Sequence, residues 1–354
     1  MSIRLALLVS VLLIIVTPLH AAPKAKPVVV VLATGGTIAG AAPSATQTVG
    51  YKAAVVTVDN LLAAVPSLKD LADVRGEQIF QIASENITPE QWRILALRVN
   101  SLLADKDVSG VVITHGTDTM EETAYFLNLV IKSEKPVVLV GSMRPSTAIS
   151  ADGPLNLYNA VAVAAAPESS GKGVFVVLND TINPAREVTK GSTFSVQTFH
   201  TPDLGALGYV QSGRPLFYRQ PLRRHTVSTP FNAESAKAMP KILILYGYAG
   251  SDGEMVEAAV KTGAAGIVYA GTGNGSLSDQ AKKALAAARK KGVQVVRSSR
   301  TGSGMVARNG EVNDDEFGFI AADNLTPQKA RVLLMLGLAV TTDTGRLQEF
   351  FQRY

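Results

Sequence analysis

Apolar runs rich in β-branched residues recur along the first two thirds of the chain, separated by stretches with helical spacing. The runs are "VVVVLA" from Val28, then "VSGVVITHG", "KPVVLVGSM" and "GKGVFVVLND", and "TPEQWRILALRVNSLLADKD" and "GPLNLYNAVAVAAAPES" lie between them. Unbroken apolar runs of this length are typical of parallel strands buried on both faces. Alternating strand and helix signals predict a wound α/β sheet.

The same alternation resumes in the last third. "KILILYGYAG", "AAGIVYAGTGNGS" and "KGVQVVRSSRTGSG" follow one another around the helical stretches "GEMVEAAVKTG" and "SDQAKKALAAARKKG". Residues 217–240 between the two parts are rich in polar residues and proline, and we interpret them as an interdomain linker. The sequence therefore predicts two wound α/β domains, a larger N-terminal one over residues 27–216 and a smaller C-terminal one over residues 241–354.

Three helix starts carry boundary signals. Thr88 stands before Pro89 with an acidic residue just after it, and Asp152 stands before "GPLNLYNAV". Pro327 opens "TPQKARVLLMLGLAV", which we predict to be the last helix of the chain and apolar enough to lie in the core.

The N-terminus has the pattern of an export signal. One arginine precedes an apolar run over residues 5–16, followed by Pro18 and a small-residue site at Ala21 and Ala22. A membrane anchor is the competing interpretation, but the run is shorter than the ~20 residues that a spanning helix needs. We therefore predict a signal peptide over residues 1–22 and a periplasmic or secreted protein that is not membrane-bound after cleavage.

Composition excludes several kinds of site. The chain has 354 residues, 47% of them hydrophobic, and no cysteine, which excludes disulfides, thiolate metal sites and a cysteine nucleophile. Its net charge of +5 is scattered, and no aromatic residues interleave with the densest clusters, "RRH" and "RKK". We expect no nucleic-acid partner, and no cofactor or metal.

Candidate chemistry begins at the end of the first strand, in "VVVVLATGGTIAG". Ligands of wound sheets collect where strands end, yet this glycine turn has neither the dinucleotide spacing nor the P-loop spacing. Thr34 and Thr37 offer hydroxyls instead. The alternative is a tight turn in which threonine caps a helix.

Two more polar clusters are predicted at strand ends, "SENITPE" from Ser84 and "THGTDTMEET". In the second, Thr117 and Asp118 lie near a helix start, where free N–H groups can hold an anion or an amide oxygen. Asp118 suits an ammonium group, and simple helix capping is the alternative. We assign no triad to His115, because neither His200 nor His225 lies in a glycine-rich strand end.

A threonine nucleophile needs an activating base. Lys190, in "REVTKGSTF", qualifies if positive or apolar neighbours lower its pKa, and is otherwise a surface lysine. Tyr51 follows "AAPSATQTVG", whose small and polar residues predict a mobile lid over residues 39–52. The residues alone thus predict a hydrolase-like site with hydroxyls, a carboxylate and a lysine.

Taken together, these motifs resemble those of the bacterial type II L-asparaginases, including the glutaminase-asparaginases, over residues 28–354. "LATGGTIAG" and "VVITHGTDTMEETAYFL" are near-verbatim family motifs. "SMRPSTAISADGPLNLYNAV", "LNDTINPAREVTK" and "IVYAGTGNGS" follow in the family's order.

The resemblance implies a role for each candidate. It implies a nucleophile at Thr37, a lid tyrosine at Tyr51, a second catalytic cluster of Thr117, Asp118 and Lys190, substrate contacts at Ser84 and Glu85, and residues given across a subunit interface at Glu311, Asn274 and Ser276. It also implies a homotetramer of intimate dimers and hydrolysis of L-asparagine through a threonine acyl-enzyme. The acceptor of the Thr37 proton stays open among Tyr51, Glu311 and the Thr117–Lys190 pair.

Two positions depart from the commonest family pattern. Glu85 stands where many members carry glutamine, and Ser276 where some carry asparagine. Both variants occur in members with glutaminase activity, so the resemblance implies secondary L-glutamine hydrolysis. Two rival functions are an exported amino-acid-binding protein without turnover and a dinucleotide-dependent enzyme. The first should have lost Thr37 or Lys190, and the second lacks its phosphate fingerprint.

Overall fold

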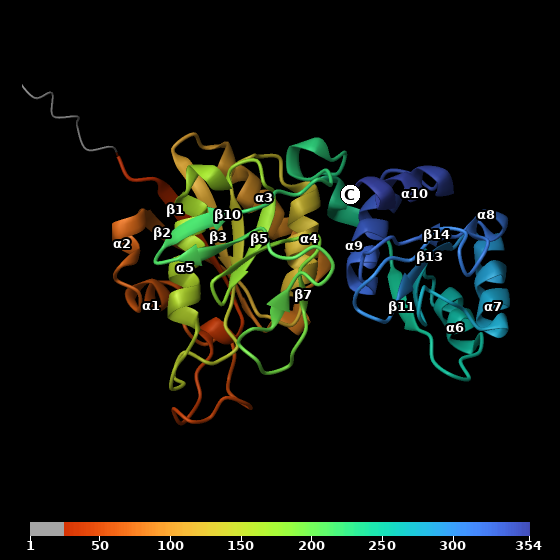
Figure 1. The fold of residues 1–354 in the computed structure, drawn as a ribbon, viewed down its shortest axis with the longest axis horizontal. Helices are drawn as coiled ribbons and strands as arrows, with labels where there is room; N and C mark the ends of the chain where they lie inside the picture. The colour runs from red at the N-terminus through yellow and green to blue at the C-terminus, as the bar shows by residue number, and fades with distance from the viewer. Residues whose placement is uncertain (1–24) are drawn as a thin grey trace, which may run out of the picture.

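The computed structural model describes residues 25–354, which form two α/β domains side by side (Figure 1). The predicted leader, residues 1–22, lies outside the described residues. The strands of the larger domain's main sheet are β1 (Val28–Gly35), β2 (Asp73–Ile82), β3 (Val108–Thr114), β4 (Val137–Val140), β5 (Val174–Leu178), β6 (Thr181–Pro184), β9 (Gly208–Gln211) and β10 (Arg214–Phe217). They lie in the order β10-β9-β6-β5-β4-β3-β1-β2. The predicted fold class is confirmed.

The central strands β2, β1, β3, β4 and β5 run parallel, whereas β6, β9 and β10 are antiparallel. The chain passes from β1 to β2 on one side and then to β3 on the other, so the winding direction reverses beside β1. Ligands of such sheets bind at the carboxyl ends of the strands at this reversal. Thr37 follows β1 and Thr117 follows β3, so both lie at the expected place.

Helices cover both faces of the large sheet. On one face are α3 (Pro89–Ala104) and α4 (Met120–Val130), and on the other are α1 (Val58–Ala63), α2 (Leu68–Leu71) and α5 (Gly153–Ala165). The predicted start of α3 is confirmed by a capping box between Thr88 and Gln91. Asp152 differs, because its carboxylate accepts the backbone N–H groups of Met143 and Arg144, both at 2.9 Å, instead of capping α5.

The smaller domain has a parallel sheet in the order β11-β12-β13-β14. Its strands are β11 (Ile242–Tyr246), β12 (Gly266–Gly271), β13 (Gln294–Ser299) and β14 (Ile320–Ala321). Its helices are α6 (Glu254–Lys261) and α7 (Asp279–Lys290) on one face, α9 (Pro327–Leu338) on the other, and α8 (Asp314–Phe317). The smaller elements of the whole chain are β7 (Thr189–Lys190), β8 (Phe199–His200), and the 3₁₀ helices η1 (Thr37–Ala39), η2 (Ser84–Asn86), η3 (Pro167–Ser169), η4 (Thr226–Ser228) and η5 (Ser235–Ala238).

The prediction that α9 is the last helix is wrong. Helix α10 (Thr344–Arg353) follows it and buries Leu347, Phe350 and Phe351. These three positions have the i, i+3, i+4 spacing of an amphipathic helix, but polar residues fill the rest of this short segment.

One apolar core is continuous between the domains. It runs from α4 through α9, which face each other in Figure 1, to the small sheet. The segment 217–240, interpreted from the sequence as a linker, contributes to it, because Phe231 is buried and its ring lies 5.2 Å from that of Phe350. The larger domain's last strand also ends inside this segment, at Phe217. In residues 25–354 no helix combines the length and the apolar character needed to cross a membrane.

Candidate active site

A cleft of about 530 Å³ opens at the carboxyl ends of β1 and β3. Of the residues predicted from the sequence, it is lined by Thr37, Tyr51, Ser84, Glu85, Thr117, Asp118 and Lys190. These residues come from four separate parts of the chain, and the winding of the sheet brings them together.

Glycines allow the strand-end turns to pack backbone against backbone. A Cβ on Gly36 would lie 2.3 Å from the Cα of Gly116, and a Cβ on Gly35 would lie 2.3 Å from the carbonyl oxygen of Ile82. Both glycines also have positive φ angles, 112° and 81° for Gly35 and Gly36. The turn after β1 is thereby pressed against the turn after β3 and the end of β2.

The two threonines of the first turn have different environments. Thr34 is buried, and its hydroxyl donates to the carbonyl oxygen of Thr114 at 2.8 Å, which ties β1 to β3. Thr37 begins η1, lines the cleft, and has its Oγ1 2.7 Å from the phenol oxygen of Tyr51. Gly36, not a threonine, occupies the cap position of η1. The Thr37 side chain therefore neither caps η1 nor ties two strands together, and its hydroxyl is available for chemistry.

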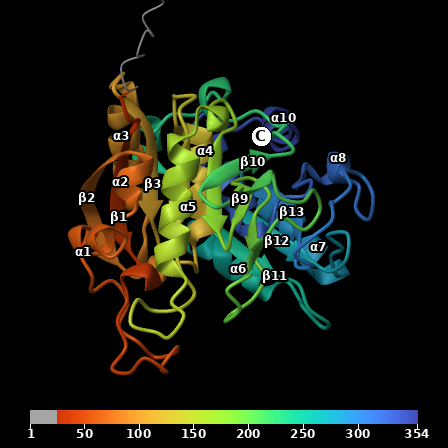
Figure 2. The same cartoon turned by 60° about the vertical axis from the view of Figure 1, so that its left-hand side comes forward.

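Tyr51 comes from the segment predicted to be a lid. In Figure 2 this segment projects beyond the body of the larger domain, beside the loop before α5. Ala41 and Lys52 pair across its base, and the backbone N–H of Ser146 donates to the carbonyl oxygen of Gly40 at 2.9 Å. Burial raises the pKa of the Tyr51 phenol, and nearby carboxylates add to this while the bond to Thr37 opposes it. Tyr51 is thus a neutral phenol at pH 7.

A second cluster faces the cleft from the turn after β3. The Nζ of Lys190, on β7, donates to Thr117 Oγ1 at 2.9 Å and forms an ion pair with Asp118 Oδ1 at 2.5 Å. The Lys190 side chain is 15% exposed and that of Asp118 is 62% exposed. The direct neighbour of Lys190 is thus a carboxylate, whereas its role as a base was predicted from the sequence only for positive or apolar neighbours.

His115 lies beneath this turn and does not line the cleft. Its Nδ1 lies 2.7 Å from the carbonyl oxygen of Gly116, and its Nε2 lies 2.9 Å from Thr123 Oγ1. Because a carbonyl only accepts, Nδ1 carries the proton. Burial lowers the pKa of His115 to about 4. His115 is therefore a neutral support for the Gly116–Thr117 turn, a role that the sequence pattern did not reveal.

Acidic side chains line the cleft together with the basic side chains of Arg144 and Lys190. Glu85 lines it together with Asp118. Ser84, in η2, is buried and packs against Gly116, whose added Cβ would lie 2.6 Å from Ser84 Oγ. The cleft thus presents two acids to a cationic group, beside the buried hydroxyls of Ser84, Thr37 and Thr117.

Some residues that line the cleft were not predicted from the sequence. They are chiefly Met143 and Arg144 after β4, and Thr193 and Phe194 after β7. Arg144 belongs to "SMRPSTAISADG". Its position directly after a buried strand could have identified it as a cleft residue. No cluster of three or more His, Asp or Glu residues suited to a metal ion occurs in the described part of the chain.

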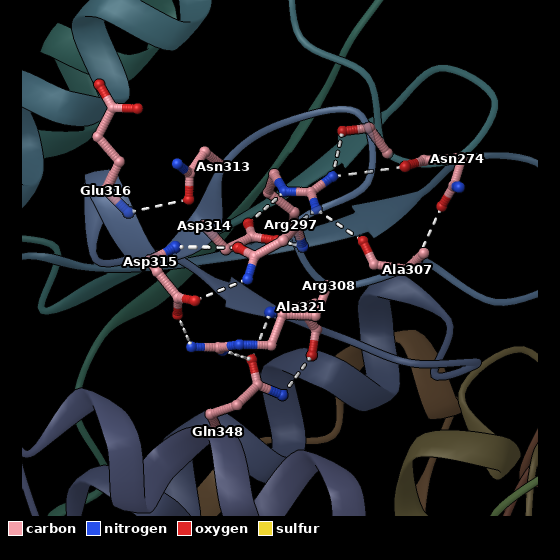
Figure 3. A network of polar contacts seen from close by, with 12 residues as sticks. Asn274, Arg297, Ala307, Arg308, Asn313, Asp314, Asp315, Glu316, Ala321 and Gln348 are labelled. Carbon is pink, nitrogen blue, oxygen red and sulfur yellow. Dashed lines mark hydrogen bonds and ion pairs between the residues drawn. The ribbon is translucent and has the colours of Figure 1, made fainter.

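Three predicted residues of the smaller domain, Asn274, Ser276 and Glu311, do not line this cleft. Figure 3 shows a polar network that includes Asn274 and is centred on Arg297, which is fully buried. Its guanidinium makes two bonds to Asp314, at 2.6 and 2.7 Å, and donates to the carbonyl oxygens of Gly275 and Ala307, at 3.0 and 3.1 Å. Asn274 Oδ1 accepts the N–H of Ala307 at 2.8 Å. The loops on which these three residues lie are therefore held in one fixed arrangement.

Two family models match most of the chain. The family model described as "Asparaginase, N-terminal" matches residues 28–223, and the one described as "Glutaminase/Asparaginase C-terminal domain" matches residues 241–351. The chain belongs to the asparaginase family. The resemblance found in the sequence motifs is confirmed.

Individual members of the asparaginase family are similar over nearly their full length. The chain is 53% identical over 331 residues to "L-asparaginase 2" of Bacillus subtilis (strain 168), covering 94% of this chain and 88% of that protein. It is 49% identical to "Probable L-asparaginase periplasmic" of Haemophilus influenzae, covering 93% of each. Among solved structures, the "Probable Cytoplasmic L-asparaginase" from Campylobacter jejuni superposes with a TM-score of 0.90 at 50% identity, covering 93% of this chain and 100% of that one.

Proposed function

We propose that this protein hydrolyses the side-chain amide of L-asparagine to L-aspartate and ammonia, with Thr37 as the nucleophile and L-glutamine as a slower substrate. The proposal rests above all on the Thr37–Tyr51 contact of 2.7 Å, which lies in a cleft that also holds the Thr117–Lys190 pair. Family membership and the names of the relatives support the same activity.

The chemistry follows acyl transfer. Thr37 Oγ1 attacks the amide carbonyl carbon and loses its proton, the C–N bond breaks, and the leaving NH2 group takes up one proton and departs as ammonia. Water then hydrolyses the threonine ester and releases aspartate. A backbone N–H of a strand-end turn, such as that of Thr117, would stabilise the oxyanion by roughly 3–4 kcal/mol.

The proton of Thr37 has Tyr51 as its first neighbour. Because the pKa of Tyr51 is raised, its phenol can accept that proton only while passing its own to another group. We infer that Tyr51 relays the proton, which ends on the leaving nitrogen of the amide, and that Lys190 holds the Thr117 hydroxyl in place beside this route. Glu311 is the remaining candidate acceptor, contributed by a partner subunit.

The substrate backbone is recognised by charge. Asp118 and Glu85 would hold the α-ammonium group, and the buried hydroxyl of Ser84 would bind the α-carboxylate. This assignment is supported by the two acids that line the cleft and by the burial of Ser84 in its wall.

Assembly and location complete the proposal. We infer a homotetramer, a dimer of dimers, in which Asn274, Ser276 and Glu311 complete a partner's cleft, since they do not line the cleft of their own chain. The domain limits stay at residues 27–216 and 241–354, with 217–240 joining them. We also infer cleavage of residues 1–22 and export, which the name of the Haemophilus relative supports and that of the Campylobacter structure does not.

The test is release of ammonia from L-asparagine by the purified chain with no cofactor added. Ammonia and aspartate in equal amounts are expected. Binding of asparagine without ammonia release would instead favour the amino-acid-binding protein, which keeps the recognition residues but not turnover.

A further inference from the structure

Lys329 is a buried cation outside the cleft. It lies in the first turn of α9, its side chain is 1% exposed, and burial lowers the pKa of its amine to about 8. Burying an amine opposes folding unless its donors are satisfied. Its Nζ donates to the backbone carbonyl oxygen of Arg186 at 2.9 Å and to that of Val188. A residue of the smaller domain thus holds a backbone segment of the larger one.

That segment leads directly into the cleft. Val188 is followed by Thr189 and then by Lys190, whose Nζ reaches Thr117 at 2.9 Å. The carbonyl oxygens that Lys329 holds are therefore two and four residues before Lys190. A shift of this backbone would move the Lys190 side chain relative to Thr117.

Glu121 links the segment held by Lys329 to helix α4, which follows the Thr117–Asp118 turn. It lies in the first turn of α4, just after the Thr117–Asp118 turn, and its Oε1 accepts from Thr189 Oγ1 at 3.4 Å and from Gln328 Nε2 at 3.1 Å. Its Oε2 lies 3.9 Å from Lys329 Nζ, beyond hydrogen-bond length. The backbone carbonyls are therefore the direct partners of Lys329.

We propose that Lys329 is a positioning residue for Lys190: by holding the carbonyls of Arg186 and Val188, the smaller domain sets the approach of Lys190 to Thr117. The proposal rests on the proposed function, in which Lys190 serves the reaction. Since α9 and α4 belong to one continuous core, this contact gives the second domain a direct part in shaping the site of the first.

The experiment compares kcat and KM for asparagine in Lys329→Met and the wild type. Misplacement of a reacting group by about 1 Å can cost ~100-fold in rate, so a fall in kcat of about 10- to 100-fold is expected. KM should change by less than about threefold, because Lys329 contacts none of the recognition residues. Lys329→Arg, which keeps several N–H donors, should recover part of the loss.

Arg331→Met is the matched control. Arg331 lies on the same helix and forms an interdomain ion pair with Glu122 at 3.7 Å, but its hydrogen bond and ion pair are to Ile242 and Glu122 and not to residues 186–190. Its removal should leave kcat within about twofold of the wild-type value. An equal loss in both variants would show only a loosened domain contact and would overturn the proposal.

A double variant separates positioning from charge balance. Glu121→Gln combined with Lys329→Met removes both charges of the buried Lys329–Glu121 pair, so it should fold even where the single variant does not, and its kcat should stay low. Recovery to the wild-type kcat, or a Lys329→Met enzyme as fast as the wild type, would overturn the proposal. A crystal structure of the variant gives a readout independent of turnover: the Lys190–Thr117 distance should exceed hydrogen-bond length, and an unchanged 2.9 Å contact would overturn it. Failure of the wild type to release ammonia would instead count against the proposed function.

Discussion

The hydroxyl oxygen of Thr37 lies 2.7 Å from the phenol oxygen of Tyr51, so a strand-end residue and a loop residue meet at one reactive point. Thr37 is fixed by the packing of β1, whereas Tyr51 is carried by the segment over residues 39–52. The orientation of the hydroxyl therefore depends on the conformation of that loop. Changes in the loop should act on turnover before they act on folding.

Thr37 and Thr34 form a matched pair for testing the nucleophile. Thr37→Ala should abolish turnover and keep the fold, because the hydroxyl of Thr37 bonds Tyr51 and not a neighbouring strand. Thr37→Ser should keep part of the activity. Thr34→Val should keep activity but lower stability by about 1 kcal/mol, the net value of the bond to Thr114. Steady-state ammonia release and thermal melts measure both. More than a few per cent of residual activity in Thr37→Ala would shift the assignment to Thr117.

Shared sites can be tested by mixing two inactive chains. If a partner supplies Glu311, hybrids of Thr37→Ala and Glu311→Ala chains contain one intact site, so activity should return after subunit exchange. The proposed assembly should also appear as a tetramer in analytical ultracentrifugation. Absence of recovery after exchange verified by mass spectrometry would argue that each cleft is complete within its own chain.

The buried Arg297–Asp314 ion pair, which supports the loops that carry Asn274 and Glu311, should contribute strongly to the stability of the smaller domain. Asp314→Ala leaves Arg297 buried without its partner, a loss of about 3–5 kcal/mol in unfolding free energy. Asp315→Ala is the matched control, since this neighbouring carboxylate is exposed and its pairing with Arg308 lies in solvent. Thermal melts should show a large fall in Tm for the first variant and little change for the second. Equal falls would mean that the loops, not the ion pair, set the stability.

The strands with an unbroken apolar pattern, and the polar residues at their ends, could be predicted from the sequence. Unbroken apolar runs predicted β1 and β3, and the polar residues at their ends are in fact neighbours in the cleft. Strand β2 was not identified, because it lies at the sheet edge with exposed positions such as Asp73 that break its apolar pattern. The contacts of Lys329 could not be predicted either, since they depend on how α9 docks on the other domain.

Stability should fall as pH decreases from 6.5 to 4 because of His115. The folded-state pKa is about 4, below the ordinary value of 6.5, so between these values the unfolded chain binds the proton that the folded one excludes. The contribution is fully present above pH 6.5, and about 3 kcal/mol of it is lost by pH 4. In His115→Gln, the unfolding free energy should fall by about 3 kcal/mol less between pH 7 and pH 4 than in the wild type. His200→Gln, at an exposed histidine, is the control and should show the same fall in unfolding free energy as the wild type. A wild-type fall in His115→Gln would mean that other groups cause the acid sensitivity.

Substrate preference should follow from the fixed distance between the recognition residues and Thr37. In the proposed complex Asp118 and Glu85 hold the α-ammonium group while the amide must still reach Thr37, so glutamine would have to fold its extra methylene beneath the loop. One methylene is discriminated by only ~1–3 kcal/mol, which favours hydrolysis of both amides with asparagine preferred in kcat/KM. Glu85→Ala should lower the glutamine rate further, because the longer substrate depends more on its anchored end, and so should a proline that stiffens residues 39–52. Steady-state kinetics on both amides decides the matter: a glutamine kcat/KM at or above that of asparagine contradicts the preference, and an undetectable glutamine rate contradicts the dual activity.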